Sequence, residues 1–238
     1  MRQITVILLV SLLLVATVAA ESQTKFGIKA GVVMANMSGD GWNTIEDMNG
    51  VTMDNKSLMG MAGGLFVEFP LGTSGVSLQP EFLYVMKGAK GETTDAGDTY
   101  TVKYKNDYLE IPVLIKYNFT STGSTSPFMF VGPVAGFNIA SKLQVADPPS
   151  DRADLGDFDI ENAKSLDLGL TIGAGLGLAM GSSGKLTFDL RYTTGLTNVY
   201  DDVDQASIDE NKAYMIDDAG NALDFKNNDI RLMVGYQF

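Results

Sequence analysis

Ten charged residues stand at alternate positions of otherwise apolar segments, and they are the residues of this chain best placed to do chemistry. They are Lys29, Lys87, Lys116, Arg191, Arg231, Glu68, Glu81, Glu110, Asp167 and Asp189. Alternate residues of a strand share one face, so these charges lie opposite the large apolar side chains. Buried charges are tolerated when they are paired and hydrogen-bonded. Five of each sign favour an internal ion-pair network; a small pore or proton path lined by them is the alternative.

The residue types give enzymatic chemistry little support. The chain has no histidine and no cysteine, which removes the Ser-His-Asp and Cys-His arrangements and the usual zinc ligands. Glu81 and Glu110 could do acid–base work if they faced each other on adjacent strands, but the nearby Lys87 and Lys116 would neutralise them. We therefore predict that the protein is not an enzyme, with no catalytic residue, cofactor or metal site.

The excess negative charge is concentrated in two polar segments of a chain whose net charge is −12. The acids are Asp147, Asp151, Asp154, Asp157, Asp159 and Glu161 in the first, and Asp201, Asp202, Asp204, Asp209, Glu210, Asp217, Asp218 and Asp224 in the second. Carboxylates suit calcium, but neither segment has the spacing and central glycine of an EF-hand. A solvated acidic surface is favoured over calcium binding or divalent bridges to anionic lipid. Nucleic acid is excluded as a partner, because binding phosphates needs a basic surface.

Hydrophobic alternation with a period of two predicts eight strands. The segments are 26–34, 59–71, 76–86, 109–117, 127–143, 166–178, 186–193 and 230–238. The fifth is the least clear, being apolar on both faces, although Gly132, Gly136 and Asn138 indicate that its even positions point inward. In the sixth, Gly173, Gly175 and Gly177 recur on one face, which is typical of spacers in a strand rather than of a dinucleotide-binding turn.

The connections between these segments alternate in length. Residues 72–75, 120–126 and 181–184 form short turns, whereas residues 38–56, 89–99, 144–163 and 197–227 form long polar loops. This asymmetry is typical of outer-membrane barrels. The sequence therefore predicts an all-β fold: an eight-stranded antiparallel transmembrane up-and-down β-barrel with four long extracellular loops and three short periplasmic turns.

The large apolar face of these strands is predicted to contact lipid. The opposite face carries many Gly, Ala, Ser and Thr residues, which are too small to fill a soluble core but fit a narrow barrel. Aromatic residues near strand ends are expected in interfacial girdles: Phe69, Tyr84, Tyr117, Phe128, Tyr192, Tyr236 and Phe238. A soluble lipocalin-like barrel is the structural alternative.

The N-terminus has the layout of a secretory signal peptide. Arg2 precedes an apolar run over residues 4–15, and small residues lead to Ala19 and Ala20. This order of basic start, apolar centre and small-residue site predicts cleavage after Ala20, which leaves residues 21–238 as the barrel domain. An uncleaved anchor is the alternative, but the run is short for a bilayer span.

The last strand carries a second targeting pattern. Apolar residues occupy every second position up to a terminal aromatic: Ile230, Leu232, Val234, Tyr236 and Phe238. This pattern resembles the C-terminal signal that the outer-membrane barrel-assembly machinery reads during insertion.

Several strand sequences resemble the PorT-like outer-membrane β-barrel family common in Bacteroidota. They are FGIKAGV, GLFVEFPL, SLQPEFLYVMKGAK, DYLEIPVLIKY, FMFVGPVAGF and DLRYTTGLTNV. The resemblance spans residues 25–238 and implies a barrel in the cell outer membrane. It identifies no active-site motif.

These observations lead to a ranked functional expectation. The first is a non-enzymatic outer-membrane barrel whose acidic loops mediate surface contacts or stabilise the membrane. The second is a component of a protein secretion or transport assembly, and the third is a narrow solute pore. The expected partners are outer-membrane lipid, the barrel-assembly machinery during insertion, and other envelope proteins; the sequence does not set the oligomeric state.

Overall fold

The computed structural model describes the segments that were predicted as strands, together with the turn at residues 72–75 and the ends of the other two short turns. It describes residues 24–39, 54–95, 98–120, 123–147, 153–160, 163–181, 184–200 and 224–238. The predicted signal peptide and its cleavage site lie outside the described residues. So do most of the acids of the second acidic segment, of which Asp224 is described.

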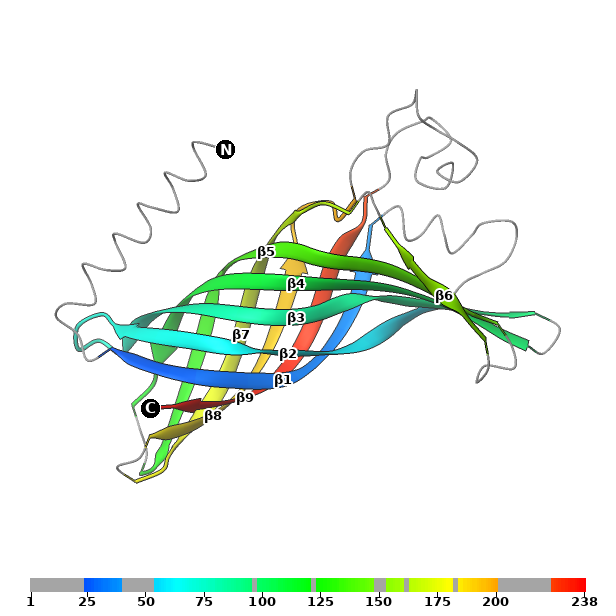
Figure 1. Cartoon of the computed structure of the whole chain (residues 1–238). Helices are drawn as coiled ribbons and strands as arrows, with labels where there is room; N and C mark the ends of the chain where they lie inside the picture. The colour runs from blue at the N-terminus through cyan, green and yellow to red at the C-terminus, as the bar shows by residue number, and fades with distance from the viewer. Residues whose placement is uncertain are drawn as a thin grey trace, which may run out of the picture.

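In the part of the chain that the structure describes, nine strands make up one antiparallel sheet (Figure 1). Their bounds are β1 Lys25–Ser38, β2 Asp54–Pro70, β3 Val76–Asp95, β4 Asp98–Asn118, β5 Thr125–Asp147, β6 Ala153–Asp159, β7 Leu166–Ala179, β8 Lys185–Gly195 and β9 Lys226–Gln237. Strands that are neighbours in the sequence pair with each other, except for β6 and β7. Both of these strands pair with β5 instead. Pairing of β1 with β9 and of β4 with β5 closes the sheet.

The closed barrel has eight strands, as the alternation predicted, because β6 pairs with β5 alone and stands outside the ring. The turn between β2 and β3 lies at one end of the barrel, together with the C-terminus, the start of β1 and the strand ends that flank the other two short connections (Figure 1). In outer-membrane barrels this is the periplasmic end, and the longer connections are extracellular. None of the described residues forms a helix long and apolar enough to cross a membrane.

Two segments that were predicted as loops are largely strand. Residues 89–99 extend β3 and β4 into a long hairpin, in which Thr93 pairs with Tyr100 and Thr94 with Thr99. Residues 144–163 contain the end of β5 and all of β6. The prediction was wrong here because polar residues were taken as loop formers, whereas Thr and Tyr favour strands and cross-strand pairing needs no buried apolar face.

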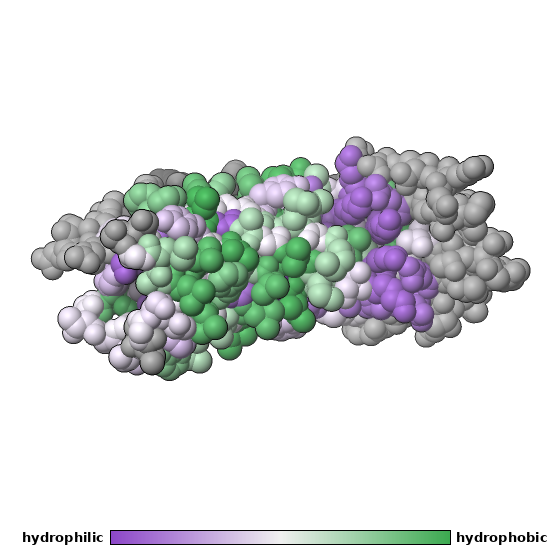
Figure 2. Space-filling view, turned by 90° about the horizontal axis from the view of Figure 1, so that it is seen from below, coloured by the Kyte–Doolittle hydropathy of each residue, from purple (hydrophilic) through white to green (hydrophobic). Residues whose placement is uncertain are grey.

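The apolar face of the strands looks outward. Large side chains such as Ile28, Leu65, Ile172 and Leu232 are about half exposed, and Figure 2 shows hydrophobic residues gathered around the middle of the barrel with hydrophilic residues beyond them at one end. A barrel in lipid needs this outward apolar band. The soluble-barrel alternative would require the same side chains to point inward.

The interior holds large aromatic rings, which the alternation pattern did not predict. Phe66, Tyr108, Phe128 and Phe130 are buried, so the placement of Phe128 in an outer girdle was wrong. Phe128 was assigned to the girdle because it lies near a strand end, against the inward direction expected of even positions in β5. Its even positions point inward, as the small residues at positions 132 and 136 indicated.

Lumen glycines make room for these rings. An added Cβ on Gly27 would collide with the ring of Phe66, and one on Gly175 would collide with the ring of Phe128. Gly173 stands in the same relation to Phe130. Gly173 and Gly175 of β7 are therefore spacers, as predicted, and they accommodate aromatic rings, whereas Gly177 leaves room for the side chains of Lys185 and Ser126.

We expect Gly175→Val to destabilise the barrel by about 1–3 kcal/mol, because an overpacked interior forces side chains and backbone to shift. A side chain at this position meets both the Phe128 ring and the carbonyl oxygen of Phe188. Guanidinium unfolding of the refolded barrel, followed by heat-modifiable gel migration, measures the change. The matched control is Ala174→Val, one residue away on the opposite face of the strand; equal loss in both variants would contradict the spacer role.

Candidate functional site

The candidate site is the barrel lumen, where the ten predicted charged residues are all buried. Glu81 accepts a hydrogen bond from Lys29 Nζ at 2.6 Å and another from Arg191 Nη1 at 2.8 Å. Arg191 also contacts Asp189 at 2.8 Å. We call Lys29, Glu81, Asp189 and Arg191 the first ion cluster; it joins strands β1, β3 and β8 across the lumen.

A second ion cluster lies further toward the extracellular end and comprises Lys87, Glu110, Asp229 and Arg231. Arg231 forms a bidentate pair with Glu110, with N–O distances of 2.6 and 3.1 Å. Lys87 Nζ lies 2.6 Å from Glu110 Oε1 and 3.5 Å from Asp229. A bidentate contact of this kind fixes the relative orientation of the two side chains as well as adding energy. The cluster therefore helps to hold β3, β4 and β9 in one register.

The two remaining predicted acids have separate partners. Glu68 accepts from Lys116 Nζ at 2.9 Å. Asp167 accepts from Asn227 at 2.9 Å and from Thr197 at 3.0 Å. Each of the ten predicted residues thus lies inside the barrel. Gln79 links the Glu68–Lys116 pair to the first ion cluster, because it accepts from Lys116 at 3.0 Å and donates to Glu81 at 2.7 Å.

Asp229 is a lumen charge that was not predicted from the sequence. It is buried and contacts Arg231. It was detectable, because it stands two residues before Arg231 and so shares the inward face of β9. With Asp229 included, the fully buried residues of the lumen comprise six acids and five bases among those described, while Lys25 and Lys185 add two cations at the periplasmic end.

Glu81 and Glu110 do not form a carboxylate pair. Glu110 is opposite Leu83 in the register of β3 and β4, so Glu81 is displaced by two residues. Each carboxylate is bound by its own lysine and arginine. Both are therefore held as ion-pair acceptors, each between two cations of its own cluster.

Aromatic rings complete the filling of the lumen. Lys116 Nζ lies 4.4 Å from the centroid of the Phe128 ring, and Lys29 Nζ lies 4.9 Å from that of Phe66. Arg191 covers Phe130 at 4.9 Å. Cation–π contacts of this kind strengthen when water is excluded. The void enclosed by these lysines and rings measures about 10 Å³, which is room for at most one water molecule.

The extracellular end of the lumen is covered by an apolar cluster. Its buried members are Met37, Ala89, Val199, Tyr200 and Phe225. Val199 donates a backbone hydrogen bond to Phe225, and residues 163 and 200 form an isolated bridge. Of the connection between β8 and β9, the described residues Val199, Tyr200 and Phe225 therefore pack over the barrel opening.

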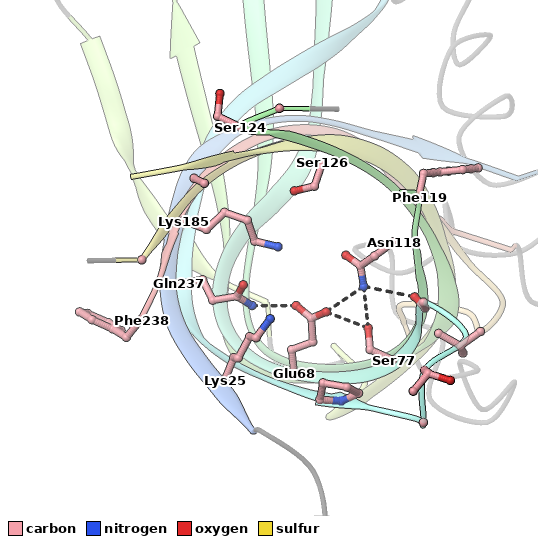
Figure 3. Close-up of a pocket in the computed structure, with 18 of the residues that line it drawn as sticks. Lys25, Glu68, Ser77, Asn118, Phe119, Ser124, Ser126, Lys185, Gln237 and Phe238 are labelled. Atoms are coloured by element: carbon pink, nitrogen blue, oxygen red, sulfur yellow. Dashed lines mark hydrogen bonds between the residues drawn. The ribbon is translucent and has the colours of Figure 1, made fainter. Parts of the chain in front are cut away.

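The periplasmic end is open and forms a vestibule of about 530 Å³. Figure 3 shows Lys25 and Lys185 reaching into it, with Glu68 hydrogen-bonded to Gln237, Asn118 and Ser77. Among the described residues, no carboxylate lies within ion-pair distance of Lys25 or Lys185. The vestibule therefore presents two cations beside a carboxylate that is already satisfied.

The predicted C-terminal signal lies on the outer face of β9. Ile230, Leu232, Val234 and Phe238 are exposed, and Phe238 stacks on Phe26 with ring centroids 5.2 Å apart. Recognition of this pattern by the assembly machinery stays a prediction.

Comparison with known proteins agrees with this architecture. Residues 19–201 match the model of a family described as the outer membrane protein beta-barrel domain. The chain belongs to this family. It is therefore an outer-membrane β-barrel protein. No curated protein matches it, and the narrower resemblance to PorT-like proteins stays a prediction.

The chain also matches solved structures at low sequence identity, of which three are given. OprG from Pseudomonas aeruginosa is 12% identical with a TM-score of 0.44, and the match covers 91% of this chain and 97% of OprG. Neisserial surface protein A is 12% identical with a TM-score of 0.42, with coverages of 90% and 97%. Ail of Yersinia pestis, in complex with the heparin analogue sucrose octasulfate, is 14% identical with a TM-score of 0.39, with coverages of 90% and 99%.

We expect Arg231→Gln to destabilise the barrel by about 3–5 kcal/mol, because removing one partner of a buried ion cluster leaves carboxylates uncompensated. The measurement is guanidinium unfolding in detergent micelles. Lys226→Gln is the matched control, since it removes a cation from the exposed pair with Asp224 and should change stability by less than about 1 kcal/mol. Equal effects would show that the second ion cluster does not stabilise the fold.

Proposed function

We propose that this protein is a non-enzymatic, non-conducting outer-membrane barrel that acts through its two ends, with a structural or surface-interaction role. The observation that carries this proposal is the filled lumen. Two ion clusters and four aromatic rings occupy the middle of the barrel, and an apolar cluster covers its extracellular opening. An ion that crossed would have to displace buried, paired charges and then the apolar cover.

The residue types also favour a non-enzymatic role. The chain contains neither histidine nor cysteine, and the two lumen glutamates best suited to acid–base work are each bound by two cations. A general base must reach a substrate proton. The void beside the first ion cluster is too small for a substrate.

We expect the refolded barrel to give no discrete conductance steps in planar lipid bilayers across wide ranges of salt and voltage, because the lumen is filled. Correct insertion is verified by the heat-modifiable shift of protein recovered from the same lipid. Reproducible ion-selective steps from the folded band would contradict the proposal and support the narrow-pore alternative.

A second candidate, a component of a secretion or transport assembly of the PorT-like kind, is favoured by the periplasmic vestibule. The vestibule measures about 530 Å³, and neither of its two lysines forms an ion pair with a described carboxylate. These features suit an acidic side chain or chain terminus of a periplasmic partner. The resemblance in the strand sequences points the same way. This candidate is compatible with a closed lumen, because the contact is made at the rim.

We expect pull-down from detergent extracts to recover a partner in fixed stoichiometry, and Lys25→Gln with Lys185→Gln to lower that recovery several-fold, because the double variant removes the vestibule cations. The control is Lys164→Gln with Lys226→Gln, which removes two cations at the opposite end. A partner recovered equally by both double variants would count against the vestibule, and a deletion strain with normal secretion would count against the assembly role.

A further inference from the structure

Five lysines form a ladder on the extracellular extension of the barrel wall. Lys56 on β2 is opposite Lys90 on β3, and Lys90 is opposite Lys103 on β4. Lys105 on β4 is opposite Lys142 on β5. Directly opposed residues of antiparallel strands share a face, with Cβ atoms about 4.5–5.5 Å apart. We call these five residues the lysine ladder.

The lysine ladder lies on the outer face of the wall. Ala89 and Tyr104 are opposite each other in the same hairpin, and both pack in the apolar cluster that covers the lumen. Because side chains alternate along a strand, the neighbours of these two residues, Lys90, Lys103 and Lys105, point away from the lumen.

The charge of the ladder is only partly neutralised by the protein. Lys56 pairs with Asp54 at 3.3 Å, and Lys90 pairs with Glu92. No described carboxylate pairs with Lys103 or Lys105, whereas Lys142 has Asp159 of β6 as its register partner. Like charges directly opposed across strands are destabilising, yet this acidic chain places five of its 17 basic residues here.

The ladder begins where the lipid-facing surface ends. Met59 and Ile139 are exposed apolar residues, each three residues from a ladder lysine, which is about 10 Å along a strand. On β3 and β4 the boundary is marked by the Tyr84 hydroxyl, which donates to Asp107 at 2.7 Å. Since the headgroup layer lies directly beyond the hydrocarbon, the lysines are level with the headgroups of the outer leaflet.

We propose that the lysine ladder binds the phosphate groups of lipid headgroups in the outer leaflet. The fit rests on charge complementarity and on position: a row of outward cations, level with the headgroups, faces the lipid around the barrel rather than the solvent above it. Long lysine side chains can reach several phosphates at once. This contact does not depend on whether the lumen conducts.

The test is native mass spectrometry of the detergent-solubilised, full mature barrel with two lipid probes: diphosphorylated lipid A and the same lipid after enzymatic dephosphorylation. We expect the parent to retain the diphosphorylated lipid at least about fivefold more than the dephosphorylated one. Lys103→Gln with Lys105→Gln should abolish this preference, because it removes the two ladder cations without a described carboxylate. Lys103→Arg with Lys105→Arg should restore it.

The matched control is Lys164→Gln with Lys226→Gln, which removes the same charge outside the ladder and should keep the parental preference. Equal retention of both lipids by the parent, or an unchanged preference in the ladder variant, would overturn the proposal. Heparin serves as a probe for a soluble polyanion: if the parent binds heparin, the ladder variant does not, and both keep the same lipid preference, the proposal is also overturned. If the ladder variant fails to fold, the test uses the parent protein alone at increasing salt concentration. A preference for the diphosphorylated lipid that does not weaken as the salt concentration rises would refute a phosphate contact.

Discussion

Lipid supplies no hydrogen-bond partner to a strand, and this one constraint shapes the whole protein. Every backbone N–H and C=O within the membrane must be satisfied by a neighbouring strand, which only a closed sheet allows. Here β1 pairs with β9 and β4 pairs with β5, which closes the ring of described strands. Closure with eight strands also fixes a lumen about as wide as the side chains that fill it.

The composition of the lumen follows from that width. Side chains that point inward lose water, so charges there must find partners. Lys29 and Glu81 lie 52 residues apart in the sequence, and Arg231 and Glu110 lie 121 apart, yet each pair is in contact across the barrel. Aromatic rings occupy the remaining space, and glycines on adjacent strands accommodate them. The result is a packed interior that leaves little room for a passing solute.

The two ends of the barrel differ, and the proposed functions rest on them. The extracellular end carries an apolar cover inside and the lysine ladder outside. The periplasmic end is an open vestibule lined by Lys25 and Lys185. One end thus offers a charged flank to the lipid around it, and the other offers a cavity to whatever lies beneath the membrane.

The sequence by itself determined the strands and the direction of most side chains, because the side-chain period of a strand is two and any apolar face shows it directly. Their odd or even position along the strand was enough to place Lys29 and Arg231 inside and Leu232 outside. Around Phe128 both faces are apolar; the small residues of that strand correctly placed its even positions inside, but Phe128 was still wrongly assigned to the outer girdle because it lies near a strand end. Where both faces are polar, as in the β3–β4 hairpin, the strand itself was overlooked. Only the tertiary structure decided which charges pair, how the lumen is capped and that lysines from four strands align, because those contacts depend on the register in which distant strands close.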